Sequence, residues 1–426
     1  MLKRCFLLAT WEGGGNVPPE LGVARRLVDR GHSVHVLGDP TIRRGAEAVG
    51  CTFSPWTRAP HHTTLDPAED PIKDWESANP LVLLQRVRDR FIAGPAGRFA
   101  ADTAEAIAAV RPDALLADAF LFGSIIAAQA ASLPVVLLVS NIWIMPARGT
   151  PPIGPGFAPA RSALGRGRDA AMLAVVNRLF AKGLPSINRV RSEYGLPPLS
   201  SFYDQGLSAD RILVLTSPEF DYAAAAVPAN VSYVGPILDD PEWAEPWEPP
   251  WPAEDQRPLV LVGFSTTYQD QGPILRRVVE ALSTLPVRAV VTLGQMLDPT
   301  EVGSSANVAV VASVPHRSVL SQASLVISHC GHGTTIKALA AGVPLVCIPM
   351  GRDQNDTAAR VVEAGAGVRL RTSASSARIR TAVSRVLGDQ RFRYNAAHLA
   401  TAISEGRRTA DLVTEIESAA GASPVA

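Results

Sequence analysis

The stretch that most constrains the fold of this chain is Ser328-His329-Cys330-Gly331-His332-Gly333-Thr334-Thr335. A β-branched run at 325–327 precedes it and good helix formers at 336–340 follow, so its glycines and hydroxyls are predicted at a strand-to-helix turn. Such a turn directs free backbone N–H groups and the positive end of a helix dipole into one crevice. The next predicted strand, 342–349, ends just before Asp353-Gln354. The pattern therefore predicts a diphosphate site at the edge of a parallel sheet, beside a carboxylate and an amide that can bind hydroxyl groups.

Composition sets the class of protein. The chain has 426 residues, of which 47% are hydrophobic, and this is enough for two ordinary domains. Forty basic residues balance forty acidic ones without a basic run, so no nucleic-acid partner is expected. No stretch approaches the roughly 20 apolar residues of a membrane span, and the apolar run within residues 1–10 is too short for a signal peptide. Four cysteines without metal-like spacing are predicted to be reduced thiols, as in a soluble cytoplasmic protein.

The first 234 residues read as one doubly wound domain. A strand at 5–9, the loop Gly13-Gly14-Gly15-Asn16, a helix at 21–29 and a strand at 33–37 form a predicted βαβ unit. The glycine spacing does not complete a dinucleotide motif, so the loop is expected to open a cleft to substrate. A helix is predicted from Leu81 to Val110. The strand that follows carries Asp118 at its carboxyl end.

Two irregular regions interrupt this domain, at 54–79 and 143–157. Both are rich in proline, and loops this long usually form lids or binding surfaces. We expect them to build an apolar acceptor pocket, with His61, His62 and Trp143 as its candidate residues.

A linker rich in proline and tryptophan is predicted at 235–258. The second domain, 259–426, again alternates strands with helices, which is typical of a doubly wound sheet. Its helical tail, 377–419, is long enough to cross back and pack on the first domain.

The ordered run of Val314-Pro315-His316, the stretch from His329 to Thr335, Gly342-Val343-Pro344 and Asp353-Gln354 resembles the nucleotide-sugar signature of family-1 glycosyltransferases. The resemblance covers nearly the whole chain and is closest to bacterial enzymes that decorate macrolides, enediynes and other polyketides, and hence to antibiotic biosynthesis. It implies the GT-B fold, in which two Rossmann-like domains face each other across a cleft. It also implies inverting sugar transfer without a metal or other cofactor, and the chain has no Asp-x-Asp pair to hold a cation.

By this resemblance the C-terminal domain binds the donor. His329 would contact the diphosphate, and Thr266 would touch it from the other side. Asp353 and Gln354 would bind sugar hydroxyls, and Val314 would face the nucleobase. The remaining diphosphate donors implied by the match are Gly331, Gly333, Thr334 and Thr335.

The chain departs from the family at the general base. The family places a histidine in a Gly-His-x-x-Pro turn, whereas this chain has Asn16, and an amide cannot take a proton near neutral pH. Asp118 matches the acid that orients that histidine and is the best remaining base, ahead of His61 and His62. A purely structural role for Asp118 as a helix cap, and for Asn16 as a turn residue, also fits the sequence.

Three explanations for the missing histidine stay open. Asp118 acts as the base itself, the acceptor needs little help, or the protein binds a sugar nucleotide without transferring the sugar. The expected function is transfer of a hexose or deoxyhexose from a UDP- or TDP-sugar to a hydroxyl of an apolar small molecule, by a monomer or homodimer. The alternatives are a catalytically inactive partner protein and a sugar-nucleotide epimerase of the same fold.

Overall fold

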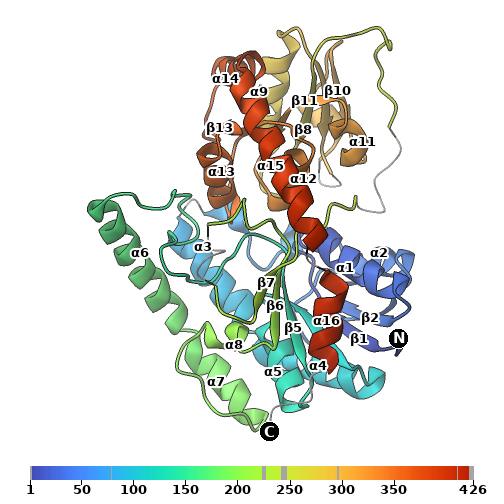
Figure 1. The fold of residues 1–426 in the computed structure, drawn as a ribbon, viewed down its shortest axis with the longest axis vertical. Coiled ribbons are helices and arrows are strands. Elements are labelled where there is room, and N and C mark those ends of the chain that lie inside the picture. Colours follow the sequence, from blue (N-terminus) through green and yellow to red (C-terminus); the bar gives the residue numbers. More distant parts are fainter. Residues whose placement is uncertain are drawn as a thin grey trace.

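The computed structural model describes residues 2–77, 79–222, 227–240, 247–294, 297–409 and 411–421. It contains two parallel sheets, one in each half of the molecule (Figure 1). The first has the strand order β3-β2-β1-β4-β5-β6-β7 and the second β10-β9-β8-β11-β12-β13. The strands are β1 (Cys5–Ala9), β2 (Ser33–Gly38), β3 (Thr52–Pro55), β4 (Ala114–Asp118), β5 (Val135–Val139), β6 (Arg211–Val214), β7 (Val231–Tyr233), β8 (Leu259–Gly263), β9 (Arg288–Thr292), β10 (Val308–Val311), β11 (Ala323–Ser328), β12 (Leu345–Cys347) and β13 (Gly367–Arg369).

Each sheet reverses its strand order once, between β1 and β4 in the first and between β8 and β11 in the second. The neighbouring strands run parallel, with Leu7 beside Leu115 and Val262 beside Ile327. In open parallel sheets ligands bind outside the carboxyl ends of the strands at this reversal. The arrangement confirms the predicted pair of doubly wound domains. The carboxyl ends of β1 and β4, and those of β8 and β11, are therefore the candidate ligand-binding edges.

The central strands of both sheets are continuous apolar runs, as expected where helices cover both faces of a sheet. All five residues of β4 and all five of β8 are buried. The first-domain helices are α1 (Val17–Asp29), α2 (Arg43–Ala48), α3 (Pro80–Arg86), α4 (Ala96–Val110), α5 (Phe122–Ala130), α6 (Ala163–Ala181), α7 (Leu184–Glu193) and α8 (Asp204–Leu207). The second-domain and tail helices are α9 (Gly272–Ser283), α10 (Pro299–Val302), α11 (His316–Leu320), α12 (His332–Ala340), α13 (Gln354–Glu363), α14 (Ser376–Gly388), α15 (Gln390–Thr409) and α16 (Leu412–Gly421).

The single helix predicted from Leu81 to Val110 is wrong. The chain forms α3, then a π-helical turn at Val87–Ile92, and starts again with α4 after Gly94 and Pro95. Proline lacks the N–H that a helix interior needs and clashes with the preceding turn. A Cβ on Gly94 would lie 1.8 Å from the Asp89 carbonyl oxygen, so the bend also requires glycine there.

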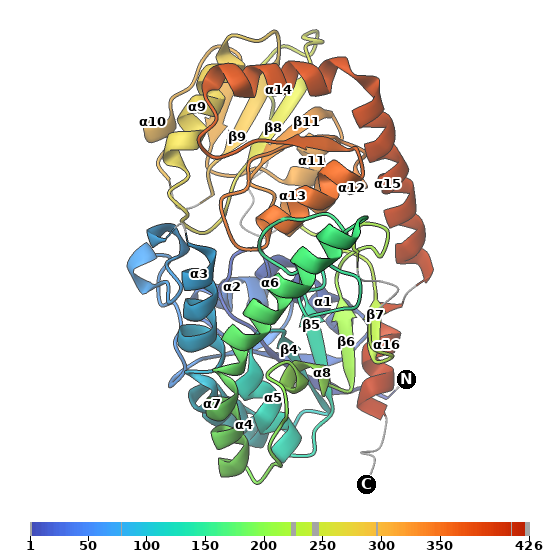
Figure 2. The same cartoon turned by 90° about the vertical axis from the view of Figure 1, so that its left-hand side faces the viewer.

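The helical tail crosses back to the first domain, as predicted. Helix α15 packs on α12 of the second domain, and α16 packs on α1, β5 and β6 of the first. Figure 1 and Figure 2 both show α15 beside the second sheet and α16 beside the first. Leu412, Val413 and Ile416 are buried in the first-domain core. The tail therefore ties the two halves together, while the exact limits 1–234, 235–258 and 259–426 stay a prediction.

The described part of the linker is packed down by aromatic rings. Trp247 and Trp251 lie 6.4 Å apart between ring centroids, and the Trp251 indole N–H donates to the Ala306 carbonyl at 3.1 Å. Trp243 falls outside the described residues. Among the helices of the described ranges, none is long and apolar enough to cross a membrane.

Candidate active site

A cavity of about 1280 Å³ lies between the two sheets. It is lined from the first domain by the glycine loop, Asn16, Asp118 and Trp143. From the second domain it is lined by Thr266, Val314, His329, Gly331, Gly333, Thr334, Asp353 and Gln354. Residues predicted from distant parts of the sequence therefore meet in one cleft.

The turn between β11 and α12 presents a helix amino terminus to this cavity. Gly331 is the N-cap of α12, and Cys330 just before it takes a positive φ of 67°. A Cβ on Gly331 would lie 2.4 Å from His329 Nε2, so glycine lets the imidazole sit against the start of the helix. Free N–H groups, the helix dipole and an imidazole then converge on one point, which suits an anion.

The His329 side chain at this site is a neutral imidazole. It is buried beside Phe264, with ring centroids 5.9 Å apart, and it hydrogen-bonds to the backbone of Gly263. Burial lowers the pKa of His329 to about 4, against the opposing effect of the Gly263 contact. A neutral imidazole can still donate one N–H to a diphosphate oxygen.

The two threonines of the turn face different surroundings. Thr334 lines the cavity. Thr335 is fully buried, does not line the cavity, and its Oγ1 has no hydrogen-bond partner among the described residues. The structure thus supports Thr334 as the hydroxyl available to a diphosphate and places the predicted Thr335 side chain in the domain interior, because successive helical residues point 100° apart.

The glycine loop of the first domain closes the cavity from the opposite side. Gly14 takes a positive φ of 78°, and a Cβ there would lie 2.6 Å from Thr266 Oγ1. Glycine is the residue type that tolerates both this backbone conformation and such close approach. The loop therefore brings the first domain against Thr266 of the second domain.

The predicted sugar-binding pair is already engaged in hydrogen bonds. Gln354 Oε1 accepts from the Met350 and Gly351 N–H groups at 2.8 and 3.0 Å, and its amide donates to Gln269 Oε1 at 2.8 Å. Burial raises the pKa of Asp353, partly offset by a hydrogen bond with Asn141 of the first domain. Gln354 is thereby held rigidly at the cavity wall.

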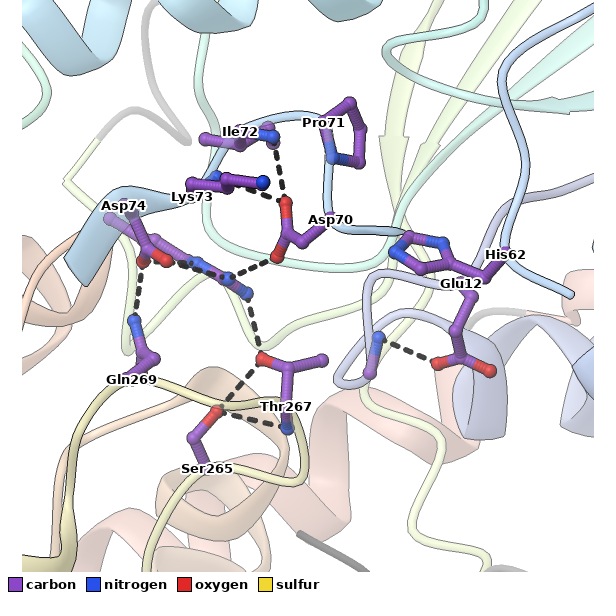
Figure 3. Close-up of polar contacts among 12 residues, drawn as sticks. Glu12, His62, Asp70, Pro71, Ile72, Lys73, Asp74, Ser265, Thr267 and Gln269 are labelled. Atoms are coloured by element: carbon purple, nitrogen blue, oxygen red, sulfur yellow. Dashed lines mark hydrogen bonds and ion pairs between the residues drawn. The ribbon is translucent and has the colours of Figure 1, made fainter. Parts of the chain in front are cut away.

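A polar bridge between the domains, which sequence reasoning missed, lies next to this pair. Figure 3 shows Asp70 and Asp74 of the first-domain loop facing Thr267 and Gln269 of the second domain. Asp74 accepts from Arg352 Nε at 2.7 Å and from the Gln269 amide at 2.6 Å. Although burial opposes it, the Arg352 guanidinium holds the pKa of Asp74 below its usual range. The irregular region at 54–79 is anchored to the second domain by these contacts.

Asn16 and Asp118 lie together at the carboxyl ends of β1 and β4. The Asn16 amide donates to the Trp11 carbonyl at 3.0 Å and to Asp118 Oδ2 at 3.4 Å. Asp118 Oδ1 accepts from the Phe120 N–H at 2.9 Å. Burial raises the pKa of Asp118, while these donors oppose the rise. Asp118 does not cap α5, whose N-cap is Leu121 without a side-chain bond.

His61 and His62, predicted in the acceptor region, do not line the cavity. His61 Nδ1 bonds the Ala59 carbonyl at 2.8 Å within its own loop, and His62 Nδ1 lies 2.9 Å from Asp39 Oδ2. Their loop folds over β2 and holds both rings in its own contacts. The first-domain side of the cavity is instead lined by apolar side chains, which include Phe91, Phe122, Trp143, Met172, Phe180 and Phe202.

Sequence reasoning also missed Glu20, a fully buried carboxyl next to Asp118. A charged residue four positions after Asn16, on the helix face that bears Leu21, Val23 and Ala24, was the available signal. In the described ranges, no cluster of three or more His, Cys, Asp or Glu side chains is arranged to hold a metal ion.

Residues 276–418 match the family model described as "Erythromycin biosynthesis protein CIII-like, C-terminal domain". Over 420 residues the chain is 31% identical to 4'-demethylrebeccamycin synthase of Lentzea aerocolonigenes, covering 96% of this chain and 98% of the relative. It is 28% identical over 399 residues to demethyllactenocin mycarosyltransferase of Streptomyces fradiae, covering 89% and 78% of the two chains.

Solved structures share the fold. The glycotransferase of kitacinnamycin matches with a TM-score of 0.74 at 23% identity, over 96% of this chain and 98% of the other. The calicheamicin glycosyltransferase CalG4 matches with a TM-score of 0.71 at 23% identity, over 99% of both chains. Together with the full-length relative and the two facing sheets, these matches show that the chain belongs to the family-1 glycosyltransferases of GT-B fold, among those of natural-product type.

Proposed function

We propose that this glycosyltransferase inverts the anomeric centre as it moves a hexose or deoxyhexose from a UDP- or TDP-sugar to a hydroxyl of an apolar small molecule. The observation that carries the proposal is the shared cavity, in which the β11–α12 turn of one domain faces Asn16 and Asp118 of the other. A donor held at the turn and an acceptor held beside Asp118 would meet in line, and such positioning supplies much of the acceleration in a displacement.

The donor half depends on electrostatics from the protein. The departing diphosphate gains negative charge as the anomeric bond breaks. We assign its stabilisation to His329, the backbone N–H groups at Gly331 and Gly333, and the hydroxyls of Thr334 and Thr266. Val314 lies at the cavity wall and is assigned to the nucleobase, and Asp353 with Gln354 to the sugar hydroxyls.

The acceptor half depends on shape and apolar contact. The aromatic and methionine side chains that line the first-domain side of the cavity fit an apolar aglycone. The names of the two relatives, one a rebeccamycin-type synthase and one a mycarosyltransferase, favour a natural-product acceptor for this chain as well.

Asp118 is the proposed base. It is the ionisable group at the cavity that lies beside Asn16, and burial raises its pKa toward the range in which a carboxylate takes a proton more readily. Transfer would form the bond from the acceptor oxygen to the anomeric carbon as the bond to the diphosphate breaks, and the hydroxyl proton would move to Asp118.

The test compares Asp118→Asn with the wild type in donor binding and sugar transfer. We expect the variant to keep its UDP or TDP affinity, measured by calorimetry, and to lose transfer by about a thousandfold, since general-base catalysis contributes roughly 10² to 10⁴. Near-normal transfer would refute the base assignment. Nucleotide binding without turnover in the wild type, across a panel of donors and acceptors, would instead support the inactive-partner alternative, and turnover without acceptor would support an epimerase.

A further inference from the structure

Glu20 is a buried acid that the proposed mechanism does not yet use. It lies in the first turns of α1, and its N–H donates to the Asn16 carbonyl at 3.2 Å. Its relative exposure is 0%, and that of Asp118 is 3%. The side chains of the two acids interact directly, and Asp118 also accepts from the Asn16 amide. The two acids therefore share a nearly buried site, with Asp118 at the cavity wall and Glu20 behind the surface.

The contacts of Glu20 fit a protonated carboxyl. Its Oε1 accepts from Ser140 Oγ at 2.8 Å, whereas its Oε2 is buried without a donor partner in the described part of the chain. The other groups that interact with this side chain are Asp118 and the Thr10 hydroxyl at the end of β1. A buried carboxylate oxygen without a donor is costly, but a protonated oxygen becomes a donor itself. Burial, followed by the charge of Asp118, raises the pKa of Glu20 well above its usual value.

The contacts of Asp118 fit a carboxylate. It accepts from the Phe120 N–H at 2.9 Å and from the Asn16 amide at 3.4 Å, and Glu20 lies against it. These groups and the hydroxyls of Thr10 and Ser140 are neutral donors, supplied by α1, by the strand ends of β1 and β5, and by the loop after β4. The positive end of the α1 dipole favours one negative charge at this point, and mutual repulsion disfavours two.

We propose that Glu20 and Asp118 form a dyad that holds one proton, with Glu20 as the protonated donor and Asp118 as the ionised acceptor. Glu20 is thus a positioning residue. It keeps the Asp118 carboxylate charged and oriented. Asn16 contributes only an amide N–H to Asp118 and cannot take a proton itself. In the transfer step Asp118 receives the acceptor proton and Glu20 retains its own. Both carboxyls are then neutral until the new proton leaves with the products.

The protonation of Glu20 can be tested without any activity. Infrared spectra of the wild type at about pH 7, far above the ordinary pKa of glutamate, should contain the C=O band of a buried protonated carboxyl. The band should disappear in Glu20→Gln and persist in Asp356→Asn, a control that removes another buried carboxyl whose pKa is raised, to about 6. A wild-type spectrum without a band that Glu20→Gln removes would overturn the dyad.

Its role in transfer rests on the proposed function and needs kinetics. Glu20→Gln keeps a donor for Asp118 and should hold kcat/KM within about threefold, whereas Glu20→Leu removes the donor and should lower kcat/KM at least tenfold, with the acidic limb of the pH profile moved to higher pH. Equal, wild-type kinetics in both variants would refute the positioning role, and so would equal losses in both.

The two proposals fail separately. If Asp118→Asn transfers normally, the base assignment is wrong, yet the infrared band still decides whether the dyad exists. If Glu20→Leu does not fold, the comparison of wild type with Glu20→Gln still decides the protonation.

Discussion

At the residue scale, neighbouring positions at the start of α12 have different surroundings: some face the cavity and others are buried in the core. Gly331 lets His329 reach the amino terminus of α12, and Gly14 lets Thr266 approach from the other domain. Thr334 and Thr335 are adjacent, yet one lines the cavity and the other is fully buried. Rotation about the helix axis, and not residue type, therefore decides which hydroxyl can meet a diphosphate.

This contrast predicts that Thr334→Val weakens UDP or TDP binding by about tenfold to a hundredfold, because one hydrogen bond to a charged group is lost. Thr335→Val is the matched control. Its Oγ1 has no partner among the described residues, so nucleotide affinity should stay unchanged and thermal stability should not fall. Calorimetric titration of both variants checks the assignment, and a larger affinity loss in Thr335→Val would reverse it.

At the scale of elements, the irregular region at 54–79, here called the strap, joins the two domains. Its short 3-10 helix Asp74–Glu76 brings Asp74 to Arg352, which holds a positive φ of 54° just before Asp353 and Gln354. Arg352 Nη1 also donates to Thr267 Oγ1 at 3.1 Å. Arg352 therefore connects the strap with the loop that carries Thr267 and with the neighbouring pair Asp353-Gln354.

Asp74→Asn should lower the free energy of unfolding by about 2 kcal/mol, since a nearly buried ion pair loses one charge. It should also increase protease cleavage within 54–79 and reduce kcat/KM for transfer. The control is Glu363→Gln in the exposed interdomain pair with Arg161, whose loss should cost less than about 1 kcal/mol. Denaturant unfolding and limited proteolysis of both variants provide the measurement, and equal effects in the two would contradict an anchoring role for Asp74.

Over the whole molecule, buried polar contacts hold the domains together on the far side of the cavity. Arg360 pairs with Asp221 at 2.7 Å, with exposed side-chain fractions of 5% and 0%. His332 Nε2 lies 2.9 Å from Thr216 Oγ1 of the first domain, and Asp356 accepts from Gly154 and Gly156. Opening of the cleft by a domain motion would have to break or rotate about these contacts.

His332 makes this interface sensitive to acid. Burial lowers the pKa of His332 to about 4, while an unfolded histidine titrates near 6.5, so the unfolded chain binds the proton first as pH falls. Stability contributed by the neutral ring is complete above about pH 6.5 and is lost toward pH 4. The wild type should thus lose about 2 kcal/mol relative to His332→Gln between pH 6.5 and 5.

Unfolding free energies of both proteins across this pH range check the prediction. Thr216→Val serves as control, because it removes the hydrogen-bond partner and keeps the titrating ring. Its pH dependence should follow that of the wild type. Parallel curves for wild type and His332→Gln would mean that the histidine is not buried neutral.

Local pattern was sufficient for the architecture. Runs such as Leu325-Val326-Ile327, followed by glycines and helix formers, depend on the chemistry of neighbouring residues alone. They predicted two parallel sheets and the turn at Gly331, whereas the missing histidine at Asn16 was recognised through the family resemblance. Pro95 was an equally local signal for the helix break, and it was overlooked.

Long-range contacts decided the rest of the site. Asp74 and Arg352 are 278 positions apart, and Asn16 and Asp118 are 102 apart. The residues around Glu20 do not predict that its carboxyl lies beside Asp118. That pairing depends on how α1 packs against the strands of the first sheet. Strands and turns follow from local chemistry, whereas the ionisation and hydrogen bonding of a buried carboxyl follow from what the fold packs around it.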